Sequence, residues 1–291
     1  MPTLAPAWNG SDIATGFESG TGTQADPYVI FSGAQLAYLA QQVNAGVSYE
    51  NTYFILSADI VLGNKAFSVI GTDSAHAFKG IIDGKNHVIR DFTITSDALA
   101  VGLFGYFDGT LKNLGIENCT IKATRTTSGP VYVGTIAYST GTIENCYTRA
   151  KITASCGYAV YAGGMVGYNL GTIKNSYASG NVTATSTNFN AVAGGFIAHN
   201  EGTVNNCVAY GNVSSTGYTE TYSLSGGFVA ENEGTLTNCY RYASQTVKHF
   251  NKAGGTNEEG TEATLAELST YYASNWSATV WNFATIYPKF R

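Results

Sequence analysis

The chain has 291 residues with 15 basic and 20 acidic side chains, which give a formal net charge of −5. This acidic balance argues against nucleic acid as a partner, because phosphate recognition needs clustered Lys and Arg side chains. No apolar run reaches the ~20 residues of a membrane span, and the first four residues lack the pattern of an export signal. An exported form of the protein would therefore have had its signal removed.

The composition favours many short strands over helices or disorder. Glycine accounts for 34 residues, aromatic residues make up 13% of the chain, and charged residues make up only 12%. Abundant aromatic residues exclude a disordered chain, and glycine with few charges is typical of strands joined by tight turns.

The first 100 residues are predicted to form an N-terminal cap and irregular first coils. Ser32 and Gln35 fit a capping box, and the apolar residues that follow lie on one face, so a helix is expected at about residues 33–45. Short strands are expected after it at residues 53–56, 80–82, 87–89 and 92–94.

Residues 101–245 contain a repeat of about 31 residues. A Gly-Thr-apolar-x-Asn motif begins at residues 109, 141, 171, 202 and 234, and a Gly-apolar-apolar-Gly/Ala motif begins seven residues before each copy. One unit holds three β-like runs, at 160–169, 172–178 and 181–185 in the third copy. Such units bury their apolar faces by stacking, which predicts an all-β fold, a parallel β-solenoid (β-helix) of three-strand coils.

Stacked repeats place equivalent residues in columns. One column is predicted to form an interior apolar ladder: Leu111, Ile143, Ile173, Val204 and Leu236. A second column contains three of the five cysteines, which we expect to be buried free thiols and not disulfides: Leu114, Cys146, Ser176, Cys207 and Cys239. A third is expected to form a turn ladder of side-chain amides: Asn113, Asn145, Asn175, Asn206 and Asn238.

Residues 246–291 are predicted to close the solenoid as a C-terminal cap. Thr264 and Glu267 open a short helical pattern, and a tail rich in Trp, Phe and Tyr follows it. We expect this tail to form a hydrophobic plug on the last coil, because the open end of a solenoid would recruit other strands.

The best candidate for catalysis is a group of glutamates just before the anchors of adjacent coils. Glu201 and Glu233 occupy equivalent positions, so their Cβ atoms should lie ~5 Å apart. A retaining glycosidase needs two carboxyl groups at about this separation. Any repeat that repeats a glutamate gives the same pair, however, so a solvated turn is the favoured interpretation.

The sequence gives little support to a metal or cofactor site. Asp83 and His87 lie close together in the sequence, but Asp-Gly is first a turn signal, and His199 is isolated from other ligand types. We therefore predict no metal ion and no cofactor.

Two columns of tyrosines are candidate binding residues. Tyr147, Tyr177 and Tyr240 directly follow the cysteine column, so strand alternation should turn them outward, where the rings could stack on sugar faces. Tyr138 and Tyr168 belong to the second column, which begins at Tyr106 and continues to His199. Ordinary stacking of aromatic rings between coils is the alternative interpretation of both columns.

The repeat resembles the GLUG-motif repeats of bacterial surface proteins, and residues 164–177 (GMVGYNLGTIKNSY) give the closest copy. The opening at 22–40 and the segment 78–89 are similar to secreted proteins of gut Bacteroidetes. The resemblance implies an exported or cell-surface, adhesin-like protein without catalytic residues, with host or dietary glycans or surface proteins as partners. A polysaccharide-acting enzyme that uses Glu201 and Glu233, and a structural spacer without a ligand, remain the alternatives.

Overall fold

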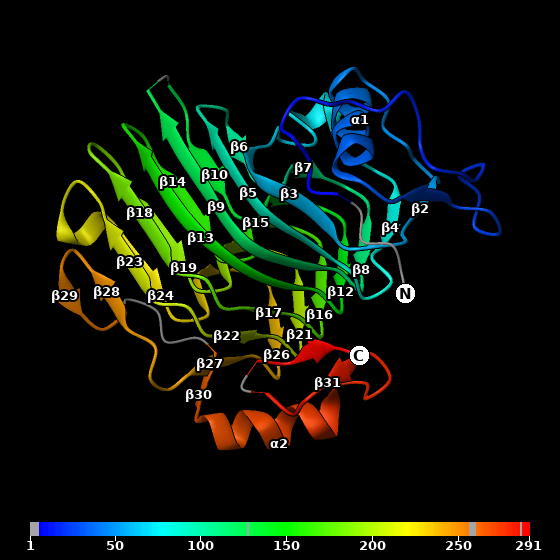
Figure 1. Cartoon of the computed structure of the whole chain (residues 1–291). Helices are drawn as coiled ribbons and strands as arrows, with labels where there is room; N and C mark the ends of the chain where they lie inside the picture. Colours follow the sequence, from blue (N-terminus) through cyan, green and yellow to red (C-terminus); the bar gives the residue numbers. More distant parts are fainter. Residues whose placement is uncertain (1–5, 127, 256–259, 286) are drawn as a thin grey trace.

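The structure, a computed structural model, describes residues 6–126, 128–255, 260–285 and 287–291. Residues 1–4, from which the missing export signal was inferred, lie outside this part of the chain. The described strands stack into a parallel β-solenoid, which confirms the predicted fold class (Figure 1). Among the described residues, no helix has the length and apolar character needed to cross a membrane.

The described strands of the solenoid lie in four sheets, in which nearly all neighbouring strands are parallel. Sheet I contains β1 (Tyr28–Ile30), β2 (Tyr53–Leu56), β4 (Ile81–Asp83), β8 (Thr110–Lys112), β12 (Thr142–Glu144), β16 (Thr172–Lys174), β21 (Thr203–Asn205) and β26 (Thr235–Thr237). Sheet II contains β6 (Ala100–Val101), β10 (Val131–Val133), β14 (Val160–Gly163), β19 (Ala191–Gly194) and β24 (Ser223–Gly226). Sheet III contains β7 (Phe104–Phe107), β11 (Ile136–Ser139), β15 (Val166–Asn169), β20 (Ile197–Asn200) and β25 (Val229–Asn232).

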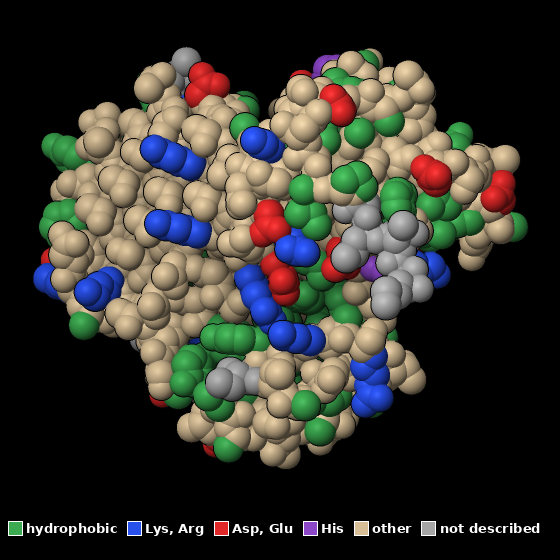
Figure 2. All heavy atoms as spheres, viewed as in Figure 1, with side chains coloured by type: hydrophobic (Ala, Val, Ile, Leu, Met, Phe, Trp, Pro, Cys, Tyr) green, Lys and Arg blue, Asp and Glu red, His purple; other side chains and the backbone are tan. Residues whose placement is uncertain are grey.

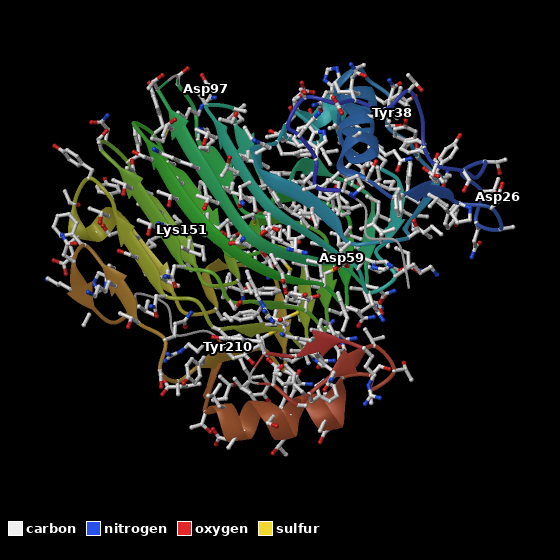
Figure 3. All side chains as sticks on the ribbon, in the orientation of Figure 1. Asp26, Tyr38, Asp59, Asp97, Lys151 and Tyr210 are labelled. Atoms are coloured by element: carbon white, nitrogen blue, oxygen red, sulfur yellow. The ribbon has the colours of Figure 1, made fainter. Side chains whose placement is uncertain are left out.

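Sheet IV is the broadest, and its long strands cross the front of Figure 1. It contains β3 (Ile60–Ala66), β5 (Val88–Ser96), β9 (Gly115–Arg125), β13 (Tyr147–Cys156), β17 (Tyr177–Ala178), β18 (Val182–Ser186), β22 (Val208–Ala209), β23 (Val213–Thr216), β27 (Tyr240–Tyr242), β28 (Val247–His249), β29 (Lys252–Ala253) and β30 (Thr261–Ala263). Its outer surface carries scattered basic side chains, Lys151 among them, and few acidic ones (Figures 2 and 3).

The predicted runs of one coil are divided further than the sequence suggested. The third unit forms five strands, β14 to β18, because two of the three runs break in the middle. The first break comes at Gly164, directly after the end of β14. A Cβ atom on Gly164 would lie 2.2 Å from the carbonyl oxygen of Gly195 in the next coil, so a larger residue would clash there. The second lies at Asn175, whose φ of 51° is in the left-handed region.

The asparagine column forms the predicted turn ladder. Its five members have φ angles between 50° and 55°. The side-chain amide of Asn145 donates to Oδ1 of Asn113 at 3.2 Å, and that of Asn206 donates to Asn175 at 3.3 Å. At the start of the ladder, the amide of Asn113 donates to Asp83 at 3.0 Å. The ladder therefore satisfies side-chain amides at a corner where the backbone leaves the strand conformation.

The interior is mainly apolar, and buried hydroxyl groups such as those of Thr135 and Thr148 hydrogen-bond to each other. Ile173 is fully buried and pairs in register with Ile143 and Val204 on the neighbouring coils. All five cysteines are buried and free, which confirms the prediction for the three in the column, Cys146, Cys207 and Cys239. Burial raises the pKa of the Cys146 thiol to about 12, so this thiol remains protonated at neutral pH.

The two helices lie at opposite ends of the described chain (Figure 1). Helix α1 (Gly33–Asn44) begins at the predicted capping box of Ser32 and Gln35, and its apolar face packs into the core. Helix α2 (Leu265–Asn275) begins at the capping box of Thr264 and Glu267. Both helices confirm the predictions made from their capping residues.

The C-terminal segment, residues 264–285 and 287–291, forms an aromatic cap but not a plug confined to the last coil. It includes α2 and the antiparallel pair β31 (Trp281–Asn282) and β32 (Lys289–Phe290), and it lies beside the solenoid below β17, β21 and β26 in Figure 1. The ring of Tyr271 contacts Tyr240 on the last coil, whereas Phe290 contacts Tyr147 three coils earlier. The segment therefore runs back along the flank of the solenoid.

Candidate functional site

The first tyrosine column lies under the C-terminal segment. Tyr147 is 3% exposed and Tyr177 is fully buried, so the prediction that they face solvent is wrong. Strand alternation does turn them away from the interior, but the rings of Trp281 and Phe290 cover them. Tyr240 is half-buried against Tyr271, with ring centroids 4.5 Å apart. The hydroxyl of Tyr210, labelled in Figure 3, meets that of Tyr272 in the same cluster.

The second column lies on the outer face of sheet III and is only half-buried. The rings of Tyr106 and Tyr138 are 5.2 Å apart, and those of Tyr138 and Tyr168 are 5.2 Å apart and nearly parallel. The imidazole of His199 continues the stack, 4.5 Å from Tyr168. The structure therefore joins Tyr138 and Tyr168 in one continuous row.

A parallel row on sheet II completes this surface. Tyr132 and Tyr161 stack on each other at 5.5 Å, and each meets the ring of Tyr168 edge to face. Sequence reasoning missed both residues, although each is the outward member of an alternating run in the strand before the glycine corner. We use the name tyrosine surface for these five residues: Tyr106, Tyr132, Tyr138, Tyr161 and Tyr168.

The stacking decides which atoms of the tyrosine surface a ligand can reach. Within a row each ring covers the faces of its neighbours, so edges and hydroxyl groups are available along the row. Burial raises the pKa of Tyr161 to about 12, with the nearby charge of Glu231 as the next contribution, so the phenol stays protonated at neutral pH. Neutral phenol groups can both donate and accept hydrogen bonds, as the hydroxyl groups of sugars do.

A pocket of about 360 Å³ lies at the Tyr106 end of the tyrosine surface, where the row begins. Its aromatic wall is formed by Tyr106, Tyr132 and Tyr138. Its polar side contains Asp108, which accepts a hydrogen bond from Oγ1 of Thr140 at 2.6 Å and lies 3.6 Å from Nζ of Lys79. The pocket thus combines tyrosine rings with a charged pair and a hydroxyl group.

The other end of the row holds a cluster of His199 and glutamates. Nδ1 of His199 lies 2.9 Å from Oε2 of Glu231, and Nε2 lies 3.2 Å from Oε1 of Glu201. The hydroxyl of Tyr168 also donates to Glu201. His199 was expected to be isolated, and the structure contradicts that expectation because its partners come from the turn after β20 and from the next coil.

The contacts of this cluster shift the pKa values of two groups in opposite directions. Burial alone would lower the pKa of His199, but hydrogen bonding and the charge of Glu231, followed by Glu201, outweigh it and raise the pKa. The hydrogen bond from Tyr168, assisted by His199, lowers the pKa of Glu201. Glu201 is therefore ionised at neutral pH.

The two glutamates singled out from the sequence lie together. Glu201, Glu233 and His199 each offer a donor atom within 4.8 Å of those of the other two. Asp83 and His87, for which a turn was the favoured interpretation, bond to different partners: Nδ1 of His87 lies 3.2 Å from Asp59, whereas Asp83 accepts from the amide of Asn113.

Comparisons with known proteins support the repeat architecture. The family described as "The GLUG motif" matches residues 158–183, so the chain is a GLUG-containing repeat protein. Halomucin of Haloquadratum walsbyi (strain DSM 16790 / HBSQ001) is 32% identical over 156 residues. That match spans 48% of this chain but only 2% of halomucin's own length.

A solved structure resembles nearly the whole chain. It is a Bacteroides ovatus protein provisionally assigned as an immunoglobulin A1 protease, with a TM-score of 0.64 and 22% sequence identity. The similarity covers 94% of this chain and 95% of that one. At this identity the likeness concerns the fold alone.

Proposed function

We propose that this chain is a non-catalytic adhesin-like module, secreted or attached to a cell surface, that binds glycans through the tyrosine surface. The observation that carries this proposal is the pocket at Tyr106, Tyr132 and Tyr138, with Asp108 and Lys79 on its polar side. Host or dietary glycans are the partners that this chemistry fits, and the proposal involves no cofactor.

The chemistry of the pocket supports a neutral, polyhydroxylated ligand. The edges of the tyrosine rings give a surface against which a sugar can pack, and their hydroxyl groups can donate to and accept from its hydroxyl groups. Asp108, Thr140 and Lys79 add an acceptor, a hydroxyl and a donor at one end. The rows continue beyond the pocket to Tyr161 and Tyr168, so a chain of several sugar units would find the same tyrosine chemistry on successive coils.

The GLUG motif and the solenoid fold shared with the Bacteroides ovatus structure support a surface repeat protein. Export of this chain and its role in adhesion belong to the proposal. Among the tyrosines predicted from the sequence as binding residues, Tyr138 and Tyr168 remain candidate ligand contacts, whereas Tyr240 is half-buried against Tyr271 of the C-terminal segment. Tyr147 and Tyr177 could serve only if the C-terminal segment moved away, because that segment covers both rings.

The experiment is a binding screen of the purified chain on a broad array of host and plant glycans. The test variant is Tyr106→Ala with Tyr132→Ala, and the control is Tyr218→Ala, whose ring is 61% exposed and far from the pocket in sequence. Two lost aromatic contacts of about 0.5–1.5 kcal/mol each predict that any glycan bound by the wild type binds roughly fivefold to 150-fold more weakly. Equal binding by both variants, or binding of no glycan, would remove the glycan proposal.

The second candidate function is that of a polysaccharide-acting enzyme centred on Glu201 and Glu233. It is supported by the carboxylate oxygens of these two residues, which lie within 4.8 Å of each other. The lowered pKa of Glu201 suits an ionised nucleophile. Incubation with polysaccharides separates the two functions: turnover that Glu201→Gln abolishes while glycan binding persists would establish the enzyme. A chain that neither binds nor cleaves a glycan would be a spacer.

A further inference from the structure

The last two coils depart from the repeat at positions that lie side by side. Where earlier coils carry Tyr138 and Tyr168, these coils carry His199 and Glu231 in register. In the same two coils, Glu201 and Glu233 occupy the position just before the glycine that opens the Gly-Thr-apolar-x-Asn motif. The result is one imidazole and three carboxylates at one end of an otherwise aromatic row.

The imidazole of His199 is fixed in orientation. Its ring is 4.5 Å from that of Tyr168 and nearly parallel to it, and Nδ1 lies 2.9 Å from a carboxylate oxygen of Glu231. A metal-binding histidine characteristically donates its other ring N–H to a carboxylate, which fixes the tautomer and turns the free nitrogen toward the ion. Here the second nitrogen is Nε2, which lies 3.2 Å from Oε1 of Glu201, so a metal ion would take the place of the proton in this contact.

The spacing of the donor atoms fits a small divalent ion. Two ligands that each lie about 2.0–2.1 Å from a tetrahedral metal ion are about 3.3 Å apart. Nε2 of His199 and Oε1 of Glu201 are 3.2 Å apart, and a carboxylate oxygen of Glu233 lies within 4.8 Å of both. Glu233 is exposed, so its side chain is free to rotate and shorten the third distance.

We propose that His199, Glu201 and Glu233 form a binding site for a divalent transition-metal ion, with Zn²⁺ as the best fit. Glu231 and Tyr168 act as positioning residues, because they hydrogen-bond to ligands and do not themselves reach the ion. One nitrogen and two carboxylates suit Zn²⁺, whereas Ca²⁺ takes six to eight oxygen ligands. Three protein ligands leave a coordination position open, and the site is independent of glycan binding at the Tyr106 end.

The scaffold favours such a site because the ladder holds its parts in register. His199 lies on β20 and pairs with Glu231 on β25, and Asn200 pairs with Asn232 beside them. The amide of Asn200 donates to Oδ1 of Asn232 at 2.7 Å, which locks the two turns that carry Glu201 and Glu233. The backbone that carries the ligands is therefore already in place, and the adjustment needed is in the Glu233 side chain.

The test is titration calorimetry of the EDTA-treated, dialysed chain with Zn²⁺, Mn²⁺ and Ca²⁺ in turn. The wild type should bind one Zn²⁺ ion more tightly than Ca²⁺, and Zn²⁺ should raise its unfolding temperature. His199→Ala and Glu233→Gln should each abolish this binding, and Glu231→Gln should weaken it by about 10–100-fold, as expected for a positioning residue. His76→Ala is the matched control, because His76 pairs with Asp73 on the surface and should leave the affinity unchanged.

Two results would overturn the proposal. The first is a wild type that binds Zn²⁺ no more tightly than His199→Ala, which would leave a hydrogen-bonded cluster only. The second is a site that survives both ligand substitutions. Glu233→Gln guards against a folding artefact, because its side chain is exposed and its replacement should leave the circular dichroism spectrum unchanged.

Discussion

Replacing Tyr177 by phenylalanine removes one hydroxyl group from the contact between the solenoid and the C-terminal segment. This hydroxyl donates to the carbonyl oxygen of Pro288 at 2.8 Å and accepts from Nη2 of Arg149 at 3.0 Å. The side chain is fully buried, so water cannot replace either bond. Arg149 keeps a second partner, Glu117, at 3.4 Å, whereas the Pro288 carbonyl loses this hydrogen bond.

The size of the effect follows from these contacts. A buried polar group that loses its partner costs about 1–3 kcal/mol, so Tyr177→Phe should lower the free energy of unfolding by that amount. Tyr177→Ala also removes a ring that stacks on Tyr147 at 5.1 Å and packs against Trp281. Loss of a buried aromatic ring costs about 3–5 kcal/mol, which is added to the hydrogen-bond loss.

The assay combines denaturant unfolding with hydrogen exchange of residues 264–285. We expect both variants to exchange faster in this range than the wild type, and Tyr177→Ala more so, because the segment opens before the coils do. The exposed Tyr218→Phe serves as the control and should stay within about 0.5 kcal/mol of the wild type. A Tyr177→Ala variant with wild-type stability and wild-type protection of the C-terminal segment would refute this reasoning.

Two further predictions concern the solenoid itself. Ile173→Ala should lower the free energy of unfolding by about 2–5 kcal/mol, and Ile173→Val by about 0.5–1.5 kcal/mol, as measured by denaturant titration. Equal effects of the two changes would argue against a packed ladder. Burial alone would raise the pKa of Asp83, but its hydrogen bonds from Asn113 and Lys85 and the nearby lysine charges lower it below 3.8. The stability from Asp83 is therefore present above about pH 4 and lost as the pH falls through the lowered value, and thermal unfolding of Asp83→Asn should show a weaker acid dependence than the wild type.

The architecture could be predicted because the repeat places the same requirement on every coil. A left-handed backbone at Asn113 and its copies recurs at intervals of 30–32 residues. At the same intervals a branched side chain recurs at Ile173 and its copies, buried in the earlier coils and partly buried at Leu236. Capping boxes gave both helix starts, because they depend only on residues three positions apart. The break at Gly164 was missed because it arises where this glycine meets the next coil, a contact that one unit alone does not reveal.

The candidate site was predicted only in part, for a physical reason. Alternation correctly turned Tyr177 away from the interior, but it says nothing of a segment 111 residues later in the chain that covers the ring. His199 was missed as part of a cluster because its partner Glu231 lies 32 residues away and becomes its neighbour only through the coil register. The predicted boundaries between the N-terminal cap, the repeat region and the C-terminal cap, at residues 100 and 245, stay predictions.

The path of the C-terminal segment bears on how the molecule comes apart. In a simple solenoid each coil touches only its neighbours, so coils can detach one after another from an open end. Here one strap joins the last coil at Tyr240 to a coil three positions earlier at Tyr147, and the intervening coils lie beneath it. Because this strap couples the final four coils, we expect them to unfold together and not one after another from the open end.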